Sequence, residues 1–511
     1  MSALVTTTYG KLEGLEQDEL AVFKGIPFAT PPVGSRRWLP PLKPSAWNGI
    51  RDARNFGAAC PQLSLSPVVL GGMQIEEPQS EDCLHLNIWT PKADNKRRPV
   101  MVWIHGGAFR IGSGAQVIYD GASLARRGDV VVVTINYRMG PFGFLRLTDL
   151  TNGKIPATGN EGLLDQIAAL EWVRDNIEHF GGDPTNVTTF GESAGGMSIG
   201  GLLAMPAARG LFHKAIPQSG FCHSGRPAAR ANRYAEKLLA HTGANASNPD
   251  SIRSFTTDEL LKATLLPGTT TEDPELGVAA YQLVVDGTHL PGVPIGYVAS
   301  GAASAIPLLV GSTLDELKLF TVVDPSNAKL DQGQLQLRMG RTLGAEAADR
   351  LIASYQRARG SRGEPDNALE ILSALETDRV FRIPAIKLVE AQLPHQPRVF
   401  NYLFTWKSPL MGGALGSCHA LELGFVFGTH GRPSMQQFSG VGPQADKLSI
   451  EMQDAWLSFA RSGDPGWAPY SSSRRTTMLF GEKSEPVDAP RDEERRAWNG
   501  VPEEVLGTLS L

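Results

Sequence analysis

Cysteine is scarce in this sequence. Its 511 residues include only four cysteines, Cys60, Cys83, Cys222 and Cys418, and no two of them stand in a Cys-x-x-Cys arrangement. That number is too small for a disulfide-based scaffold, and the spacing is not that of a zinc site or a dithiol redox site. We therefore expect no metal and no other cofactor.

Long apolar runs and dense basic runs are also missing. No stretch reaches the roughly 18 apolar residues of a membrane span, and the N-terminus has neither the basic nor the apolar part of a secretory signal peptide. Lysine and arginine number 48 against 53 aspartate and glutamate, a formal net charge of -5. No basic cluster is present that would follow a phosphate backbone. We expect a cytoplasmic protein that neither spans a membrane nor binds nucleic acid.

The residues that are present are those of a globular protein. Hydrophobic residues make up 41% and charged residues 20% of the chain. This composition suffices for a large buried core and excludes a disordered protein. The length would allow two or three domains, but large α/β enzymes often carry one sheet with insertions. We expect a single domain over residues 1–511.

Two continuous apolar runs, 99–104 and 129–136, are bounded by polar or glycine-rich segments. Such runs are typical of parallel strands that are buried on both faces. Apolar residues then recur at helical spacing over 160–181, a segment that ends in glycines. The β-branched run 186–190 follows and leads directly into Gly191-Glu-Ser-Ala-Gly195. This order predicts an α/β fold with a mostly parallel central sheet flanked by helices.

Helical patterns dominate from about residue 225 to 390, and we interpret much of this segment as a cap. An apolar run at 305–310 interrupts it, and the strand-like segment 398–404 returns the chain to the sheet. The clearest helical patterns cover 233–241, 346–359 and 368–380.

A nucleophilic serine is predicted at Ser193. A serine hydroxyl needs a base that removes its proton and a position that the substrate can reach. The Gly-x-Ser-x-Gly pattern gives the serine that position, because its glycines allow a sharp turn between a strand and a helix. In a chain with 55 glycines the pattern also arises by chance, as an ordinary turn. Here, however, a predicted strand precedes it and a predicted helix follows.

Donors for the oxyanion of an acyl-transfer reaction are predicted in the loop after the 99–104 strand. The segment His105-Gly-Gly-Ala-Phe109 has the His-Gly-Gly form of an oxyanion loop. We expect the backbone N–H groups of Gly106, Gly107 and Ala194 to be the donors, and His105 to belong to the loop rather than serve as the base. A glycine-rich turn without a catalytic role is the alternative.

The acid of such a site must follow Ser193, and the histidine must follow the acid. Glu316 comes shortly after the apolar run 305–310, at the carboxyl end of a strand, where α/β active sites form. Asp315 beside it and Asp286, in a sequence typical of a turn, are alternatives.

Only three histidines follow Glu316. His395 and His430 stand next to prolines or glycine and are typical of surface turns. His419 follows the glycine-rich segment 412–418, which is long enough to carry an imidazole over the serine. We predict that His419 is the base.

These motifs resemble the type-B carboxylesterase and cholinesterase family, in particular its bacterial para-nitrobenzyl esterase-like carboxylesterases. The resemblance implies an α/β-hydrolase fold with helical cap insertions. It also favours Glu316 and His419, because the family's acid lies in a Gly-x-x-x-Asp-Glu segment and its histidine precedes Glu-x-x-Phe-Val-Phe-Gly. The matching segments are 23–34, 80–89, 105–109, 135–138, 180–184, 191–195, 218–220 and 425–428.

The function implied is that of a serine carboxylesterase, which hydrolyses small-molecule carboxylic esters through an acyl-enzyme intermediate on Ser193. An amide or carbamate hydrolase with the same triad is one alternative. A non-catalytic adhesion protein is another, although such proteins typically lack the nucleophile. We expect a monomer or a small homo-oligomer.

Two further features concern the family's variable parts. Its members pair the cysteines that match Cys60 and Cys83, which implies that a disulfide can form here. Cholinesterases carry a tryptophan in the loop that matches 61–82, where it binds quaternary ammonium by cation–π attraction. This loop has no tryptophan. Choline esters are therefore not expected as preferred substrates.

Overall fold

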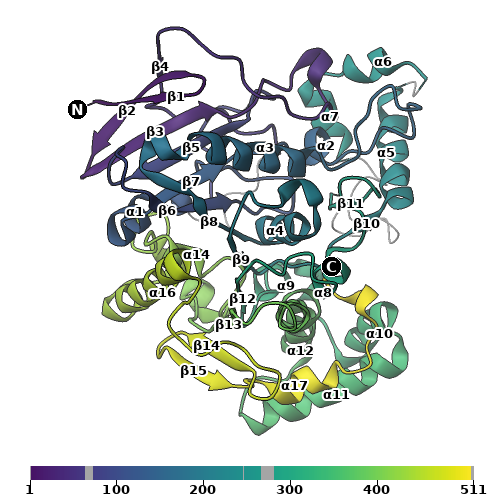
Figure 1. The fold of residues 1–511 in the computed structure, drawn as a ribbon. Helices are drawn as coiled ribbons and strands as arrows, with labels where there is room; N and C mark the ends of the chain where they lie inside the picture. The colour runs from purple at the N-terminus through teal and green to yellow at the C-terminus, as the bar shows by residue number, and fades with distance from the viewer. Residues whose placement is uncertain (1, 64–72, 245–246, 266–280, 508–511) are drawn as a thin grey trace.

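The computed structural model describes residues 2–63, 73–244, 247–265 and 281–507, and its central feature is one large β-sheet (Figure 1). The strands lie in the order β1-β2-β3-β5-β7-β6-β8-β9-β12-β13-β14-β15, β4 pairs with β2, and β10 and β11 form a separate small sheet. The strands are β1 (Ser2–Thr7), β2 (Gly10–Gln17), β3 (Leu20–Pro27), β4 (Ile50–Asp52), β5 (His85–Thr90), β6 (Arg98–Ile104), β7 (Val131–Ile135), β8 (Gly182–Glu192), β9 (Lys214–Gln218), β10 (Arg226–Pro227), β11 (Val284–Val285), β12 (Leu308–Thr313), β13 (Val399–Phe404), β14 (Thr476–Phe480) and β15 (Glu485–Asp488).

The middle of the sheet is parallel and its two ends are antiparallel. From β7 through β6, β8, β9, β12 and β13 to β14, every neighbouring pair is parallel. The N-terminal strands β1, β2, β3 and β5, and β15 at the other end, pair antiparallel. The mostly parallel sheet predicted from the sequence is confirmed, and the runs 99–104 and 129–136 correspond to β6 and β7.

Hydrophobic cores lie on both faces of this sheet. Val100 and Val102 of β6 belong to the core that also includes residues of α3 and α4, whereas Met101 and Trp103 belong to the core that includes residues of α16. Successive side chains of a strand point to opposite faces. Because both faces of β6 are covered by protein, every position of the run is apolar.

Helices flank the sheet on both sides (Figure 1). The helix predicted over 160–181 is α3, which continues into a short 3₁₀ turn at Ile177–Phe180. The helices are α1 (Ala122–Gly128), α2 (Gly140–Gly143), α3 (Glu161–Asn176), α4 (Ala194–Ala204), α5 (Ala228–Thr242), α6 (Pro249–Arg253), α7 (Thr257–Ala263), α8 (Pro294–Ala299), α9 (Lys318–Thr321), α10 (Gln332–Leu343), α11 (Ala345–Ser361), α12 (Ala368–Thr377), α13 (Ile383–Gln392), α14 (Leu423–Val426), α15 (Gln436–Ser439), α16 (Pro443–Ser462) and α17 (Asp492–Ala497).

The segment 225–390, where a cap is predicted, contains helices α5 to α12 and most of α13. Helices α10, α11 and α12 share a hydrophobic cluster of their own with Trp498, which follows α17. A π-helical turn, Asp378–Arg382, joins α12 to α13. The segment also contains β12, a central strand of the sheet. The extent of the cap and the single-domain organisation stay predictions.

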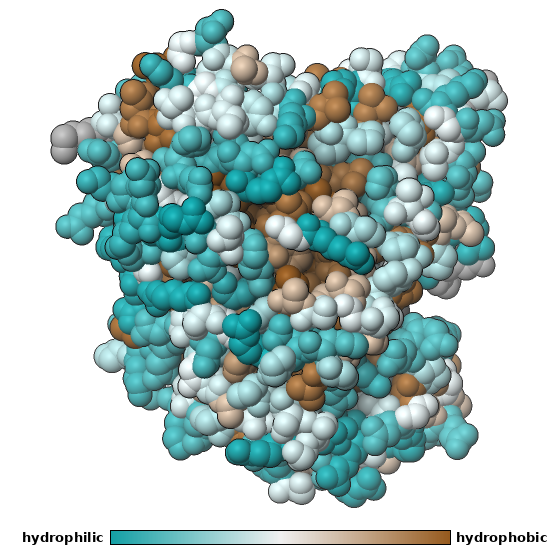
Figure 2. Space-filling view, viewed as in Figure 1, coloured by the Kyte–Doolittle hydropathy of each residue, from teal (hydrophilic) through white to brown (hydrophobic). Residues whose placement is uncertain are grey.

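The surface in Figure 2 is mostly hydrophilic, and hydrophobic side chains gather in a hollow near the middle of the face shown. Within the described part of the chain, no helix is long and apolar enough to cross a membrane.

A buried ion pair fixes the chain after β7 to helix α3. The Nε and Nη2 atoms of Arg138 donate to the two carboxylate oxygens of Asp165 at 2.8 and 2.7 Å, and the backbone N–H of Arg138 donates to the same carboxylate. Both side chains are almost fully buried. Removing one partner would leave an unpaired charge in the interior.

We therefore expect Asp165→Asn to lower the free energy of unfolding by about 3–5 kcal/mol. Urea-induced unfolding followed by circular dichroism measures this loss. Asp454→Asn is the matched control, because Asp454 forms an exposed ion pair with Arg127, and its loss should stay below about 1 kcal/mol. A loss for Asp165→Asn no larger than that of the control would contradict the expectation.

Candidate active site

Ser193 lies at the sharp turn between β8 and α4. Its backbone has φ 55° and ψ -122°, a conformation that residues with a side chain rarely adopt. Its N–H donates to Gln218 O at 2.9 Å, and its C=O accepts from Met197 N at 2.8 Å. The turn is therefore held both by the neighbouring strand β9 and by the first turn of α4.

Glycines beside Ser193 allow a close backbone approach. A Cβ atom at Gly195 would lie 2.0 Å from the carbonyl oxygen of Ile104, at the end of β6. A Cβ atom at Gly106 would lie 3.1 Å from Cβ of Ser193 and 2.8 Å from the carbonyl oxygen of Glu192. The His-Gly-Gly loop and the serine turn thus touch each other, as expected if Gly106 serves the serine.

The oxyanion loop predicted at 105–109 is fixed through His105. Its ring stacks on Tyr137 at a centroid distance of 4.5 Å, and Nδ1 lies 2.9 Å from Gly106 O. Burial lowers the pKa of His105 to about 4, so its ring is neutral and Nδ1–H donates to that carbonyl. The C=O and N–H of a trans peptide point in opposite directions. Holding Gly106 O on one side therefore directs the N–H of Gly107 to the other.

Glu316 lies in the turn after β12 and is fully buried. Its Oε1 atom accepts hydrogen bonds from Ser219 Oγ at 2.6 Å and from Thr313 N at 2.7 Å. Its Oε2 atom lies 2.6 Å from Nδ1 of His419. Because every partner is a donor, the carboxylate is held in one orientation.

His419 is buried between this carboxylate and the serine turn. Its Nε2 atom lies 3.0 Å from Oε1 of Glu192, the residue before Ser193. That Glu192 oxygen makes no hydrogen bond, so the contact lacks hydrogen-bond alignment. The rings of Phe381 and Phe320 pack on the imidazole at centroid distances of 4.9 and 5.6 Å. Nδ1 is therefore engaged by Glu316, and Nε2 faces the serine turn.

Two further buried carboxyl groups lie near His419, and our reasoning from the sequence gave neither a role. Glu192 is the variable residue inside Gly-x-Ser-x-Gly. Glu422 is the glutamate that follows His419 in the quoted family motif, and its Oε1 accepts from Nε2 of Gln218 at 3.1 Å. Their places inside these two motifs are the signal that could have drawn attention to them, but their burial depends on residues far away in the sequence.

The three carboxyl groups and the imidazole influence one another's charge. Burial disfavours the imidazolium, but the charges of Glu192 and Glu316 outweigh it and raise the pKa of His419 to about 9. Burial raises the pKa of Glu192 to about 7. Burial and the charges of Glu192 and Glu316 raise the pKa of Glu422 to about 8. Burial therefore disfavours the charged forms of Glu192 and Glu422.

The alternative acids have other partners. Asp315 accepts from the backbone N–H of Ser417 and forms an ion pair with Lys318. Asp286 accepts from three successive backbone N–H groups at 288–290, as in the turn suggested by its sequence. Neither carboxylate contacts His419 in the structure.

The alternative histidines also lie elsewhere. The Nε2 atom of His395 is 2.8 Å from Ala299 O, and that of His430 is 2.9 Å from Asp446 Oδ1. The structure therefore brings together Glu316 and His419, with Glu192, the residue before Ser193, against the imidazole, and none of the alternatives.

Cys60 and Cys83 are both buried free thiols in this structure. A hydrogen bond to Cys60, together with burial, raises the pKa of the Cys83 thiol well above its ordinary value. The two thiols are thus neighbours, and a disulfide between them stays a prediction.

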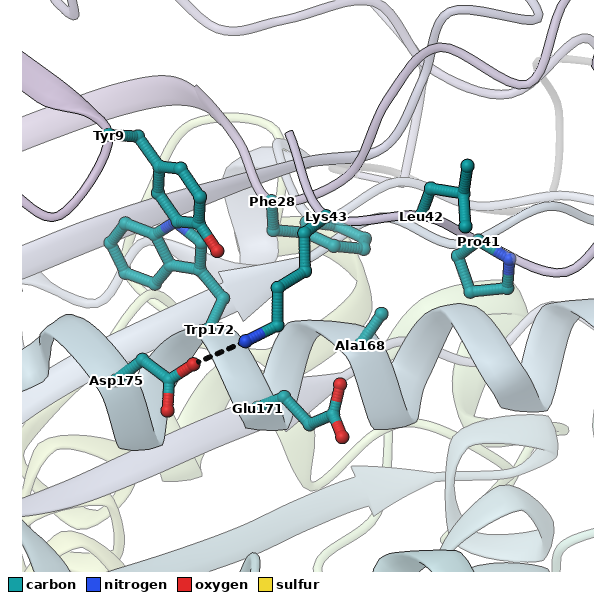
Figure 3. A pocket seen from close by; sticks show the side chains of 9 residues that line it. All are labelled: Tyr9, Phe28, Pro41, Leu42, Lys43, Ala168, Glu171, Trp172 and Asp175. Atoms are coloured by element: carbon teal, nitrogen blue, oxygen red, sulfur yellow. Dashed lines mark hydrogen bonds and ion pairs between the residues drawn. The ribbon is translucent and has the colours of Figure 1, made fainter. Parts of the chain in front are cut away.

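A cavity of about 180 Å³ lies against helix α3, apart from these residues (Figure 3). Lys43 and Asp175 form an ion pair of 3.0 Å across it. None of the predicted site residues lines this cavity, so it is not the candidate active site. Its lining residues are Tyr9, Phe28, Pro41, Leu42, Lys43, Ala168, Glu171, Trp172 and Asp175.

The fold and this geometry define a class, the serine hydrolases of the α/β-hydrolase fold. Comparisons with known proteins specify it further. The model of the carboxylesterase family matches residues 1–498. A para-nitrobenzyl esterase of Bacillus subtilis (strain 168) is 40% identical over 96% of this chain and 98% of its own length. A phenmedipham hydrolase of Pseudarthrobacter oxydans is 33% identical over 94% of this chain and 95% of its own length.

Solved structures agree with these relatives. A Geobacillus stearothermophilus carboxylesterase superposes with a TM-score of 0.86 at 41% identity, covering 97% of this chain and 100% of its own. A PNB esterase superposes with a TM-score of 0.83 at 39% identity and the same coverage. The chain belongs to the carboxylesterase family, and it is a carboxylic ester hydrolase. The predicted family and fold are confirmed, and the amide hydrolase alternative is not favoured.

The charge of Glu192 offers a direct test of this electrostatic arrangement. The negative charge of Glu192, 3.0 Å from Nε2, stabilises the imidazolium of His419. Glu192→Gln removes that charge. The pKa of His419 should therefore fall, and the ring should lose its proton at a lower pH than in the wild type. Nitrogen NMR of histidine-labelled protein, with the resonance assigned by His419→Gln, measures the titration.

Glu422→Gln is the matched control, because the Glu422 charge affects the pKa of His419 less than the Glu192 charge does. Its decrease should be the smaller of the two. An unchanged or raised pKa in Glu192→Gln would show that the charge of Glu192 does not act on the imidazole.

Proposed function

We propose that Ser193, His419 and Glu316 form the catalytic triad of this esterase, and that Gly106, Gly107 and Ala194 supply the oxyanion donors. The observation that carries the proposal is the buried hydrogen bond of 2.6 Å between Nδ1 of His419 and Oε2 of Glu316. This bond leaves Nε2 as the nitrogen that exchanges a proton with the serine. Ser193 itself is presented by a strained turn beside the glycine loop.

In the first step, Ser193 Oγ attacks the ester carbonyl carbon and its proton passes to Nε2 of His419 in the neutral form of the imidazole, which becomes more abundant as the pH rises toward the raised pKa of His419. The carbonyl oxygen becomes an oxyanion, which the N–H groups of the glycine loop and of Ala194 stabilise. The carbon–oxygen bond to the alcohol then breaks, and His419 gives its proton to the departing alkoxide. An acyl-enzyme remains on Ser193.

In the second step, His419 removes a proton from a water molecule that attacks the acyl carbon. The second oxyanion collapses, Ser193 Oγ leaves and recovers the proton from His419, and the carboxylic acid is released. Throughout, Glu316 holds the Nδ1–H tautomer and stabilises the positive charge of the imidazolium. Every proton is thus accounted for by residues of this chain and by water.

The substrate class proposed is small carboxylic esters. The mostly esterase names of the relatives support it. An activity screen with para-nitrophenyl esters of increasing acyl length, at matched concentration, would define the acyl preference.

Ser193→Ala should fold normally and lower the turnover of a para-nitrophenyl ester by about 10⁶-fold, because the acyl-enzyme can no longer form. Circular dichroism tests folding, and steady-state kinetics measures turnover. An organophosphate probe should label the wild type at Ser193 and leave the variant unlabelled. A folded variant that retains most of its activity would overturn the assignment of the nucleophile.

Glu316→Gln should lower kcat by about 10⁴-fold, because the amide no longer holds the Nδ1–H tautomer or stabilises the imidazolium. Asp315→Asn is the matched control on the neighbouring residue and should change kcat by only a few-fold, since Asp315 contacts Ser417 and Lys318 instead. Equal losses in the two variants would indicate that Glu316 is not the acid.

A further inference from the structure

The oxyanion loop is held in an unfavourable backbone conformation. Ala108 and Phe109 have φ 53° and 58°, in the left-handed region that side chains disfavour. The loop then folds back, with the N–H groups of Arg110 and Ile111 donating to Gly107 O. Residues in such conformations keep them only when the surrounding structure holds them. Contacts from outside the loop must therefore help to maintain it.

One such contact comes from Gln62, which lies in the chain between β4 and β5 and is only 6% exposed. Its side-chain Oε1 accepts from Gly112 N at 2.7 Å, and its Nε2 donates to Gly112 O at 3.0 Å. Nε2 also donates to Cys60 O at 2.9 Å. The amide thus binds both polar groups of Gly112 at once, as a neighbouring strand would.

Gly112 in turn lies directly behind the oxyanion loop. Its φ is +117°, and a Cβ atom there would lie 2.5 Å from Nδ1 of His105 and 2.6 Å from Gly106 O. These are the two atoms whose hydrogen bond directs the Gly107 N–H. Any shift of Gly112 would therefore be transmitted to the peptide that carries a proposed oxyanion donor.

We propose that Gln62 is a positioning residue that fixes the oxyanion loop through Gly112. The inference rests on the proposed function, because it concerns the donors assigned there. Gln62 touches Gly112 rather than the reacting atoms. Losing its hydrogen bonds frees the loop to relax from its strained shape, so that the donors no longer match the position of the oxyanion.

Such a role makes a specific kinetic prediction. The oxyanion exists only in the transition state and the tetrahedral intermediate, so misplaced donors raise the barrier without weakening ground-state binding. Gln62→Met, which keeps the length of the side chain and removes its polar atoms, should lower kcat by about 10- to 100-fold. KM for a para-nitrophenyl ester should stay within about threefold.

A trifluoromethyl ketone separates this role from a purely structural one. Ser193 Oγ adds to the ketone carbon, its proton passes to His419, and the ketone oxygen becomes an oxyanion in the same loop. The inhibition constant of the ketone should rise in Gln62→Met by about the same factor as kcat falls. Inhibition by the corresponding non-electrophilic alcohol should not change.

Gln79→Met is the matched control. Gln79 is exposed and accepts from the backbone N–H of Gln62, so this variant disturbs the same segment without touching Gly112. It should leave kcat and ketone inhibition unchanged. If Gln62→Met does not fold, Gln62→Asn keeps both the donor and the acceptor on a shorter side chain and should show a smaller loss of the same kind.

A folded Gln62 variant with wild-type kcat and ketone inhibition would overturn the inference, even if its melting temperature falls. A rise in KM alone would also overturn it. The failure of the proposed function itself is recognised separately, because Ser193→Ala would then stay active.

Discussion

The buried pair of His419 and Glu316 is the interaction on which the site depends. Burial would drive a lone imidazole to its neutral form and a lone carboxylate to its protonated form. Together, each offsets the cost of burying the other, and the donors Ser219 and Thr313 complete the shell of the carboxylate. The orientation of the imidazole is thus settled before any substrate arrives, and no binding energy is needed to arrange it.

Backbone strain also occurs in the segments that form the site. Ser193, Ser219 and Ala420 all have positive φ, as do Ala108 and Phe109 of the oxyanion loop. Each such residue costs on the order of 1–3 kcal/mol. The central parallel strands, buried on both faces, supply the stability that offsets this cost. The stable central sheet therefore allows these strained turns, and the turns place Ser193 and the oxyanion loop next to each other.

The sequence predicted the middle of the sheet better than its ends. Central strands are covered on both faces and read as continuous apolar runs, whereas β1 alternates buried and exposed residues and β15 is largely exposed. Local patterns also indicated Ser193, Glu316 and His419. They could not indicate Gln62, because its partner Gly112 lies about 50 positions away. They included Glu422 in a motif but could not show its burial, because its partner Gln218 lies about 200 positions away. Burial of that kind is decided by the fold as a whole.

Backbone pairing explains how the acid and base meet although 103 residues separate them. Strands β12 and β13 pair in parallel up to Thr313 and Phe404. Beyond the strands, the two loops that follow them are joined again, because Asp315 N donates to Ser417 O at 2.9 Å and His419 N donates to Glu316 O at 3.3 Å. A one-residue slip in this register would move the glutamate to the other face of the sheet. The helices between the two strands can therefore vary in length without changing the distance from acid to base, since the strand register and the hydrogen bonds between the two loops set it.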